Sequence, residues 1–255
     1  MESIELDGTS STVRTIRVAE GPGPSVLIVG LHGYGMDERQ MRTLVDVVPA
    51  RAHRYVAVRG FRALDGGGHA WFPVTVVGGR PAWSTADVRG AIVRLSRLLD
   101  RLARRYAVDP GSVFVVGYSQ GAAMALATAL LAPDSAAGFV GFAGAVPRDL
   151  AAFAATDGGS RAVLLGHGTR DARVSADDVA RSADALRAIG HDVEVASFDA
   201  PHVVSAAGRA RIAAWLDERP IDRSANGVDA PSPDALPTSR QRRRDAPPAH
   251  RRERP

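Results

Sequence analysis

The segment that most constrains the fold is a β-branched run that leads into a serine flanked by glycines and then into an alanine-rich helix. It reads Val-Phe-Val-Val-Gly-Tyr-Ser-Gln-Gly-Ala-Ala-Met over residues 113–124. A serine at the tip of a strand-to-helix turn requires a sharp reversal, and the positions two before and two after it must lack a large side chain. Gly117 and Gly121 meet this demand around Ser119. The pattern predicts an exposed serine nucleophile; a turn with a capping serine is the alternative.

Short apolar runs rich in β-branched residues alternate with longer helical patterns along most of the chain. We expect strands at residues 26–29, 55–58, 138–142, 162–165 and 193–198, besides the one that begins at Val113. We expect helices over residues 38–47, 85–106, 175–189 and 204–218, besides the one that follows Ser119. This alternation favours an α/β fold with a mostly parallel central sheet and helices on both faces.

The length and the charge distribution predict one folded domain and a tail. A chain of 255 residues with 45% hydrophobic content can bury a full core, which we place in residues 1–218. Residues 219–255 are rich in proline and arginine and hold nine of the 32 basic and five of the 28 acidic residues, so residues 1–218 carry 23 of each sign. The folded domain is therefore not expected to bind nucleic acid. The tail is predicted to be disordered, with or without a weak contact to anionic surfaces.

Composition excludes several classes of chemistry. The chain has no cysteine, so a thiol nucleophile and thiolate-ligated clusters are excluded, and it has no lysine, which excludes a lysine Schiff base and a Walker lysine. No metal-ligand spacing occurs. The N-terminus lacks the features of a signal peptide and no apolar run is long enough to span a membrane, so we expect a cytoplasmic protein.

A serine nucleophile needs a base, and in proteins with this turn the acid and then the histidine follow the serine along the chain. His167, His191, His202 and His250 follow it. His202 comes after the strand at 193–198 and is our predicted base. His191 and His250 are expected to be exposed, and His167 to pack at a strand end.

Asp171 is the predicted acid, because it follows the strand that precedes the base-bearing strand. Asp199 is the main rival, since it lies three residues before His202, and a turn-forming aspartate is the other reading of Asp171. Asp177 and Asp178 are expected in the first turn of the following helix, where carboxylates suit the helix dipole.

Attack on a carbonyl creates an oxyanion, which needs backbone donors. The Gln120 N–H is the first predicted donor, at the start of the helix. The second is assigned to the Tyr34 N–H, in the glycine-rich loop of residues 31–37 after the first strand, although a plain turn is the alternative and the donor could shift by one residue.

Three motifs resemble the phospholipase/carboxylesterase family of α/β-hydrolases, which includes carboxylesterases and acyl-protein thioesterases. They are Leu-His-Gly-Tyr-Gly-Met-Asp-Glu at 31–38, Gly-Tyr-Ser-Gln-Gly-Ala-Ala-Met at 117–124 and His-Gly-Thr-Arg-Asp at 167–171. An Ala-Trp-Phe segment at 70–72 is also similar, and the likeness covers roughly residues 12–218. It implies an α/β-hydrolase fold and a Ser119, Asp171 and His202 triad without a cofactor. Pro73, Ser175 and the segment 141–144 depart from the family pattern, which bears on the substrate.

The leading functional hypothesis is a serine hydrolase that cleaves small carboxylic esters of short to medium acyl length through an acyl-enzyme on Ser119. A lysophospholipase or acyl-protein thioesterase is one alternative, and a catalytically inactive binding protein with the same fold is the other. Trp71 and Phe72 could wall the substrate pocket, although aromatic side chains also serve as core. The sequence does not specify an oligomeric state.

Overall fold

The computed structural model describes residues 2–6, 9–18, 26–47, 54–77, 80–155 and 158–219. In this part of the chain an eight-stranded sheet has the order β1-β2-β4-β3-β9-β10-β11-β12. Its strands are β1 (Glu2–Leu6), β2 (Thr9–Val18), β3 (Leu27–Leu31), β4 (Arg54–Val58), β9 (Val113–Tyr118), β10 (Gly138–Phe142), β11 (Ala162–Gly168) and β12 (Asp192–Phe198). All pairs from β4 to β12 are parallel, whereas β1 and β2 add an antiparallel edge. The predicted mostly parallel sheet is confirmed.

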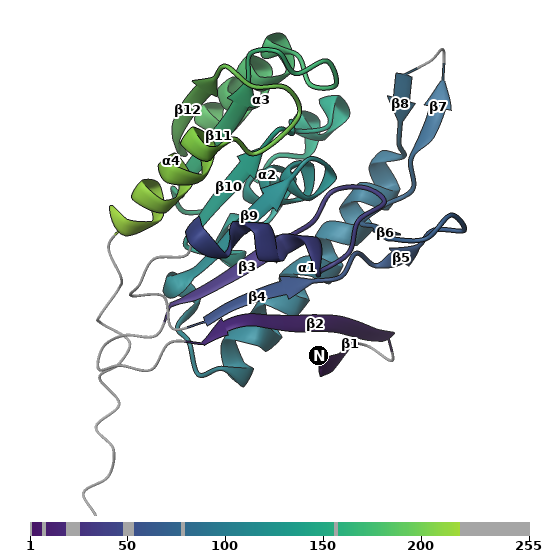
Figure 1. Cartoon of the computed structure of the whole chain (residues 1–255), viewed down its shortest axis with the longest axis vertical. Helices are drawn as coiled ribbons and strands as arrows, with labels where there is room; N and C mark the ends of the chain where they lie inside the picture. Colours follow the sequence, from purple (N-terminus) through teal and green to yellow (C-terminus); the bar gives the residue numbers. More distant parts are fainter. Residues whose placement is uncertain are drawn as a thin grey trace, which may run out of the picture. The chain divides into compact units, whose positions relative to one another are not determined.

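Helices cover both faces of the sheet, as predicted (Figure 1). The α-helices are α1 (Thr85–Arg105), α2 (Gln120–Leu131), α3 (Ala176–Ala188) and α4 (Ala206–Asp217). The 3₁₀ helices are η1 (Gln40–Val47), η2 (Pro110–Ser112), η3 (Pro133–Ser135) and η4 (Arg148–Phe153). Helix α2 packs against α1 and α3 on one face, and α4 packs with η1 on the other.

Two hydrophobic cores lie on opposite faces of the sheet because successive strand residues point in opposite directions. In β9, Val113 and Val115 belong to the core beneath α1, α2 and α3, whereas Phe114 and Val116 belong to the core beneath α4 and η1. The apolar face of α1 is buried in the first of these cores; it comprises Val88, Ile92, Leu95, Leu98, Leu99 and Leu102. Because its side chains are buried in a core on each face, β9 is an interior strand of the sheet. The serine turn follows its carboxyl end.

The structure differs from the sequence prediction mainly at polar or short elements. Strands β1 and β2 were not predicted, because β2 reads Thr-Ser-Ser-Thr-Val-Arg-Thr-Ile-Arg-Val and lacks a continuous apolar run. Two short hairpins were also missed, β5 (Arg62–Ala63) with β6 (His69–Ala70) and β7 (Thr75–Val77) with β8 (Arg80–Ala82). The helix expected over residues 38–47 is the 3₁₀ helix η1, and β11 extends three residues beyond its predicted end.

The described residues all belong to one compact unit that spans Met1–Asp222. Among them, no helix combines the length and the apolar character that crossing a membrane requires. The tail predicted for residues 219–255 lies outside the described residues, apart from Arg219, and so does His250. The predicted disorder and surface contacts of the tail stay predictions.

Candidate active site

Ser119 is the single residue between β9 and α2, and its backbone is strained. Its φ of 54° and ψ of −115° lie where residues with a side chain are rarely found. A methyl group at Gly117 would lie 2.2 Å from the Gly121 carbonyl oxygen, and one at Gly121 would lie 2.1 Å from that of Leu31. Both distances are far shorter than van der Waals contact, so the turn requires glycine on both sides of the serine.

The structure brings the three predicted triad residues together at the carboxyl ends of three parallel strands. Ser119 follows β9, Asp171 follows β11 and His202 follows β12. The Ser119 Oγ lies 2.9 Å from His202 Nε2, and His202 Nδ1 lies 2.7 Å from Asp171 Oδ2. The His202 side chain is 14% exposed and the Asp171 side chain is fully buried. This arrangement has the geometry of a nucleophile, a base and an orienting carboxylate.

Three hydrogen-bond donors fix the charge of Asp171. Its Oδ2 accepts from His202, and its Oδ1 accepts from the N–H groups of Arg173 at 2.8 Å and Val174 at 3.1 Å. Burial alone would raise the pKa of Asp171, but the hydrogen bonds from Arg173, His202 and Val174 together hold the pKa below its usual value. An ionised carboxylate only accepts hydrogen bonds, so Nδ1 of His202 carries the proton and Nε2 is free to accept from the Ser119 hydroxyl.

A close approach of two loops positions the acid beside the base. A methyl group at Gly168, the last residue of β11, would lie 2.4 Å from the Ala200 carbonyl oxygen and 2.5 Å from that of Pro201. The Arg170 N–H also donates to the Ala200 carbonyl at 3.0 Å. The absence of a side chain at Gly168 therefore lets the loop that carries His202 pack closely against the loop that carries Asp171.

The glycine-rich loop after β3 lies directly against the serine. A methyl group at Gly33 would lie 3.3 Å from Ser119 Cβ. Two backbone hydrogen bonds hold the loop to β6, since the Gly35 N–H donates to the His69 carbonyl at 2.9 Å and the His69 N–H donates to the Met36 carbonyl at 2.8 Å. Tyr34 directly precedes Gly35, and its N–H has no hydrogen-bond partner among the described residues. The role of this N–H as an oxyanion donor stays a prediction.

The Gln120 backbone N–H lies in the first turn of α2, where no intrahelical acceptor exists. Its side chain has a separate function that the sequence did not predict. The buried amide accepts from the Trp71 N–H through Oε1 at 3.0 Å and donates to the Phe72 carbonyl through Nε2 at 2.9 Å. The Gln120 side chain thus holds the segment that follows β6 in place through two hydrogen bonds to its backbone.

His32 is a fully buried structural residue of the same loop. Its Nδ1 donates to the Gly33 carbonyl at 2.7 Å and its Nε2 accepts from the Gly60 N–H at 2.8 Å. The second bond requires an unprotonated Nε2, and burial is the main cause that lowers the pKa of His32. The ring therefore stays neutral and stabilises the conformation of the loop that lies against Ser119.

Comparison with known proteins assigns the family. The sequence profile of the phospholipase/carboxylesterase family matches residues 14–216. The chain belongs to this family. A probable carboxylesterase of Oryza sativa subsp. japonica is 28% identical to it over 169 residues, which cover 64% of this chain and 70% of the rice protein. The protein is therefore a carboxylesterase-family hydrolase, as its motifs indicated.

Solved structures with the same fold include two esterases. Esterase PE8 superposes with a TM-score of 0.69 at 26% identity, covering 82% of this chain and 97% of its own. The carboxylesterase of Bacillus cereus superposes with a TM-score of 0.71 at 21% identity, covering 81% of this chain and 93% of its own. The α/β-hydrolase fold predicted from the family resemblance is confirmed.

Trp71 and Phe72, predicted to wall a substrate pocket, are 2% and 3% exposed in this family member. The Trp71 indole donates from Nε1 to the His32 carbonyl at 2.8 Å and meets the Phe61 ring edge-on, and the Phe72 ring packs edge-on against Trp83. These contacts give both rings a structural function behind the glycine-rich loop. Their contact with a substrate stays a prediction.

Two of the rival histidines, His167 and His191, lie among the described residues, and both are buried. His167 is buried within β11, which confirms that it packs at a strand end. The prediction that His191 is exposed is wrong, because it is 5% exposed and its ring spans two backbone groups. Its Nε2 donates to the Ala129 carbonyl at 2.8 Å and its Nδ1 accepts from the Arg161 N–H at 3.3 Å. His191 therefore connects the turn before β12 to α2 and to the residue before β11, and neither ring nitrogen bonds to Ser119.

The other carboxylates considered for the role of the acid lie elsewhere in the structure. The Asp199 side chain is 83% exposed and accepts from Arg170 Nε at 2.6 Å rather than from His202. Asp177 and Asp178 lie in the first turn of α3, as predicted. Among the described residues, no group of three or more histidines and carboxylates is placed to hold a metal ion.

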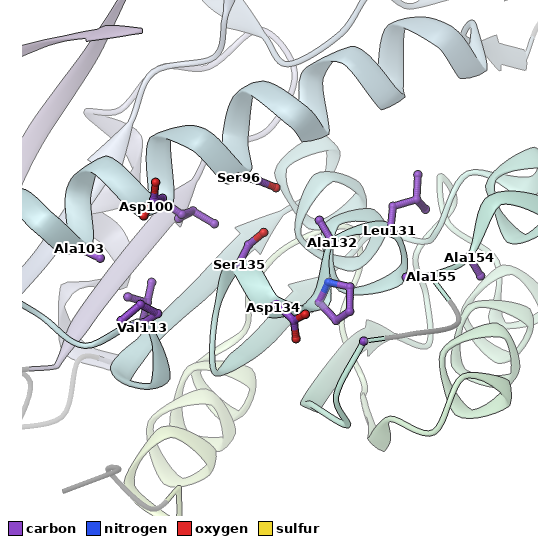
Figure 2. A pocket seen from close by; sticks show the side chains of 14 residues that line it. Ser96, Asp100, Ala103, Val113, Leu131, Ala132, Asp134, Ser135, Ala154 and Ala155 are labelled. Atoms are coloured by element: carbon purple, nitrogen blue, oxygen red, sulfur yellow. The ribbon is translucent and has the colours of Figure 1, made fainter. Parts of the chain in front are cut away.

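A cavity of about 610 Å³ lies at the opposite edge of the sheet (Figure 2). It is lined by Val113, at the start of β9, and by Leu131, at the end of α2, together with Ser96, Asp100 and Asp134. Ser119 follows the other end of β9 and precedes the first residue of α2. The cavity is therefore separated from the triad by the length of both elements.

Two side-chain contacts of the site were not predicted from the sequence. For Gln120 only the backbone N–H was assigned a role, and Tyr118 was named only as part of the serine motif. The Tyr118 hydroxyl donates to the His202 carbonyl at 2.8 Å. Both hydrogen bonds join segments 48 to 84 residues apart, so no local pattern could have revealed them.

Proposed function

We propose that this family member is a serine carboxylesterase that hydrolyses carboxylic esters of short to medium acyl length through an acyl-enzyme on Ser119. The observation that carries the proposal is the continuous hydrogen-bond chain from Ser119 Oγ through His202 to the buried Asp171 carboxylate. The match to the family along residues 14–216 supports an ester as the substrate class.

In the acylation step, His202 Nε2 accepts the hydroxyl proton while Ser119 Oγ bonds to the ester carbonyl carbon. The carbonyl electron pair moves to the oxygen, where the N–H groups of Gln120 and Tyr34 would donate to the negative charge. Asp171 stabilises the imidazolium that has formed. When the bond to the alcohol oxygen breaks, His202 returns the proton to the leaving alcohol and the acyl group stays on Ser119.

In the deacylation step, a water molecule replaces the alcohol. His202 accepts one of its protons as the water oxygen bonds to the acyl carbon, and it then returns the proton to Ser119 Oγ as the acyl bond breaks. The products are a carboxylic acid and the free serine. No step requires a cofactor, and the same two backbone donors serve both oxyanions.

The test is the turnover of p-nitrophenyl esters from acetate to decanoate by the full chain and by Ser119→Ala. Removing the nucleophile is expected to lower kcat by about 10³-fold or more. Ser84→Ala is the matched control, because Ser84 caps α1 and its loss costs only about 1 kcal/mol of stability. Equal turnover by Ser119→Ala and the full chain would refute the proposal. Lysophosphatidylcholine and an acyl thioester in the same panel test the two alternative substrates, and a strong preference for either would replace the carboxylesterase assignment.

A further inference from the structure

Tyr118 occupies a place in the site that the mechanism above does not use. It is the last residue of β9, immediately before the nucleophile, and its side chain is partly buried between two loops. On one side, a methyl group at Gly33 would lie 3.2 Å from Tyr118 Cδ1, so the ring contacts the glycine-rich loop. On the other side, the ring centroid lies 5.5 Å from that of His202.

The hydroxyl of Tyr118 makes the most informative contact. It donates to the main-chain carbonyl of His202 at 2.8 Å. Burial is the main cause that raises the pKa of Tyr118, with Asp171 acting in the same direction and Arg173 against it. The hydroxyl therefore remains a donor throughout the pH range in which the imidazole can act as a base.

Other segments hold the loop that carries the base at residues on either side of His202. The Arg170 N–H donates to the Ala200 carbonyl at 3.0 Å and Arg170 Nε to Asp199 at 2.6 Å, and Arg209 Nη1 donates to the Val204 carbonyl at 3.0 Å. Between Phe198 and Ser205, the backbone bonds within the loop are those from the N–H of Ala200 to the Phe198 carbonyl and from that of Val203 to the Pro201 carbonyl. Neither involves the His202 backbone. The Tyr118 hydroxyl is thus the hydrogen bond that fixes the main chain of the base itself to the strand that carries the nucleophile.

We infer that Tyr118 is a positioning residue of the triad, whose hydroxyl holds the His202 main chain so that the imidazole spans Ser119 and Asp171 at once. This inference rests on the proposed function of the triad. One rigid strand end then controls both ends of the Ser119 to His202 hydrogen bond, because Tyr118 and Ser119 are adjacent in the chain. Without the hydroxyl, the His202 main chain loses its hydrogen bond to β9, and we expect both imidazole hydrogen bonds to lengthen.

The test compares Tyr118→Phe with Tyr55→Phe in the full chain. Tyr55 is a matched control, because its hydroxyl also donates to a main-chain carbonyl, that of Met41 at 2.8 Å, in the core beneath α4. Tyr118→Phe is expected to lower kcat about three- to tenfold with KM unchanged, which is the effect of one hydrogen bond on a positioned base. Tyr55→Phe is expected to lower the melting temperature and leave kcat unchanged.

The pH profile separates positioning from a merely structural role. Two charged residues lie near Tyr118 and His202. Asp171 accepts a hydrogen bond from the imidazole, and Arg173 acts to lower the pKa of Tyr118. A weaker bond to Asp171 favours the imidazolium less, so the acid limb of kcat/KM moves to lower pH in Tyr118→Phe. Loss of folded protein would instead lower kcat/KM by the same factor at every pH and would not move the acid limb. An unmoved limb, or a kcat equal to that of Tyr55→Phe, would overturn the inference.

A spectroscopic readout keeps this inference distinct from the proposed function. The proton on His202 Nδ1 is identified in the proton NMR spectrum as the downfield signal that His202→Gln lacks. In Tyr118→Phe this signal is expected to broaden and move upfield, because its bond to Asp171 is less well held. If the full chain lacks Ser119-dependent turnover but the signal changes as expected, the esterase proposal fails and the positioning role stands. If turnover depends on Ser119 and the signal is unchanged, the positioning role fails alone.

Discussion

The Gln120 side chain offers a direct test of how the serine turn is held to its surroundings. The amide accepts from the Trp71 N–H and donates to the Phe72 carbonyl, and the residue is 8% exposed. Gln120→Glu keeps the size and shape of the side chain. An ionised carboxylate still accepts from Trp71, but it cannot donate to Phe72 and instead places a negative oxygen against a carbonyl.

The expected cost is about 2–4 kcal/mol of unfolding free energy at pH 8, from one lost hydrogen bond, an unsatisfied buried carbonyl and a buried charge. Protonation restores a donor, so the cost depends on pH. A penalty of about 3 kcal/mol on the ionised form corresponds to a folded-state pKa about two units above the unfolded value near 4.3. Because the folded-state pKa is raised, the deficit is small below pH 4.3, grows as the pH rises to about 6.5, and is constant above that.

Urea unfolding followed by tryptophan fluorescence at pH 4.5 and pH 8 measures this deficit against the unmodified chain at each pH. Gln40→Glu is the control, because Gln40 is exposed and its Oε1 accepts only from the Asp37 N–H. This control is expected to change stability by less than about 0.5 kcal/mol at either pH. A Gln120→Glu deficit that is equal at the two pH values, or below about 0.5 kcal/mol at pH 8, would contradict the argument. It would show that the hydrogen bonds of the Gln120 amide to Trp71 and Phe72 do not contribute the expected free energy of unfolding.

Three further changes test other parts of the account. Gly121→Ala places a methyl group 2.1 Å from the Leu31 carbonyl oxygen and is expected to cost about 3 kcal/mol or more in urea unfolding. Gly90→Ala, in the exposed middle of α1 with open space around it, should instead stabilise by about 0.5–1 kcal/mol, and equal effects of the two changes would contradict the steric argument. Asp171→Asn is expected to lower kcat/KM for an ester about 10³- to 10⁴-fold, and a loss under tenfold would remove Asp171 from the triad. Because the pKa of Asp171 is depressed, its contribution to stability is present above the unfolded value near 3.9 and is lost below it, so the stability difference between the two proteins should shrink under acid conditions.

Much of the central fold could be predicted from the sequence, because its strands are continuous apolar runs. β10 has the predicted bounds, and the buried face of α1 follows from its 3.6-residue period. Strand β2 escaped prediction because it is rich in serine, threonine and arginine and has few apolar residues, and its pairing with β1 and β4 makes it a strand. His191 was misplaced for a related reason, since its partner Ala129 is 62 residues away.

At the site, the residue types and their order along the chain were sufficient to select Ser119, Asp171 and His202 for the same edge of the sheet. Parallel strands deliver their carboxyl ends to one edge, so the loops that follow them meet there. The supporting contacts could not be predicted in this way. The Tyr118 hydroxyl and the Gln120 amide act on backbone groups of distant segments, and a backbone carbonyl has no signature in the sequence.

The central claim is that Ser119 is an activated nucleophile, and covalent labelling tests it most directly. Intact-protein mass is measured after incubation of the full chain and of Ser119→Ala with a fluorophosphonate probe. The account predicts one adduct on the full chain and none on Ser119→Ala, because only a serine whose proton His202 accepts attacks the phosphorus rapidly. A folded full chain that forms no adduct, or an adduct that persists in Ser119→Ala, would contradict the account.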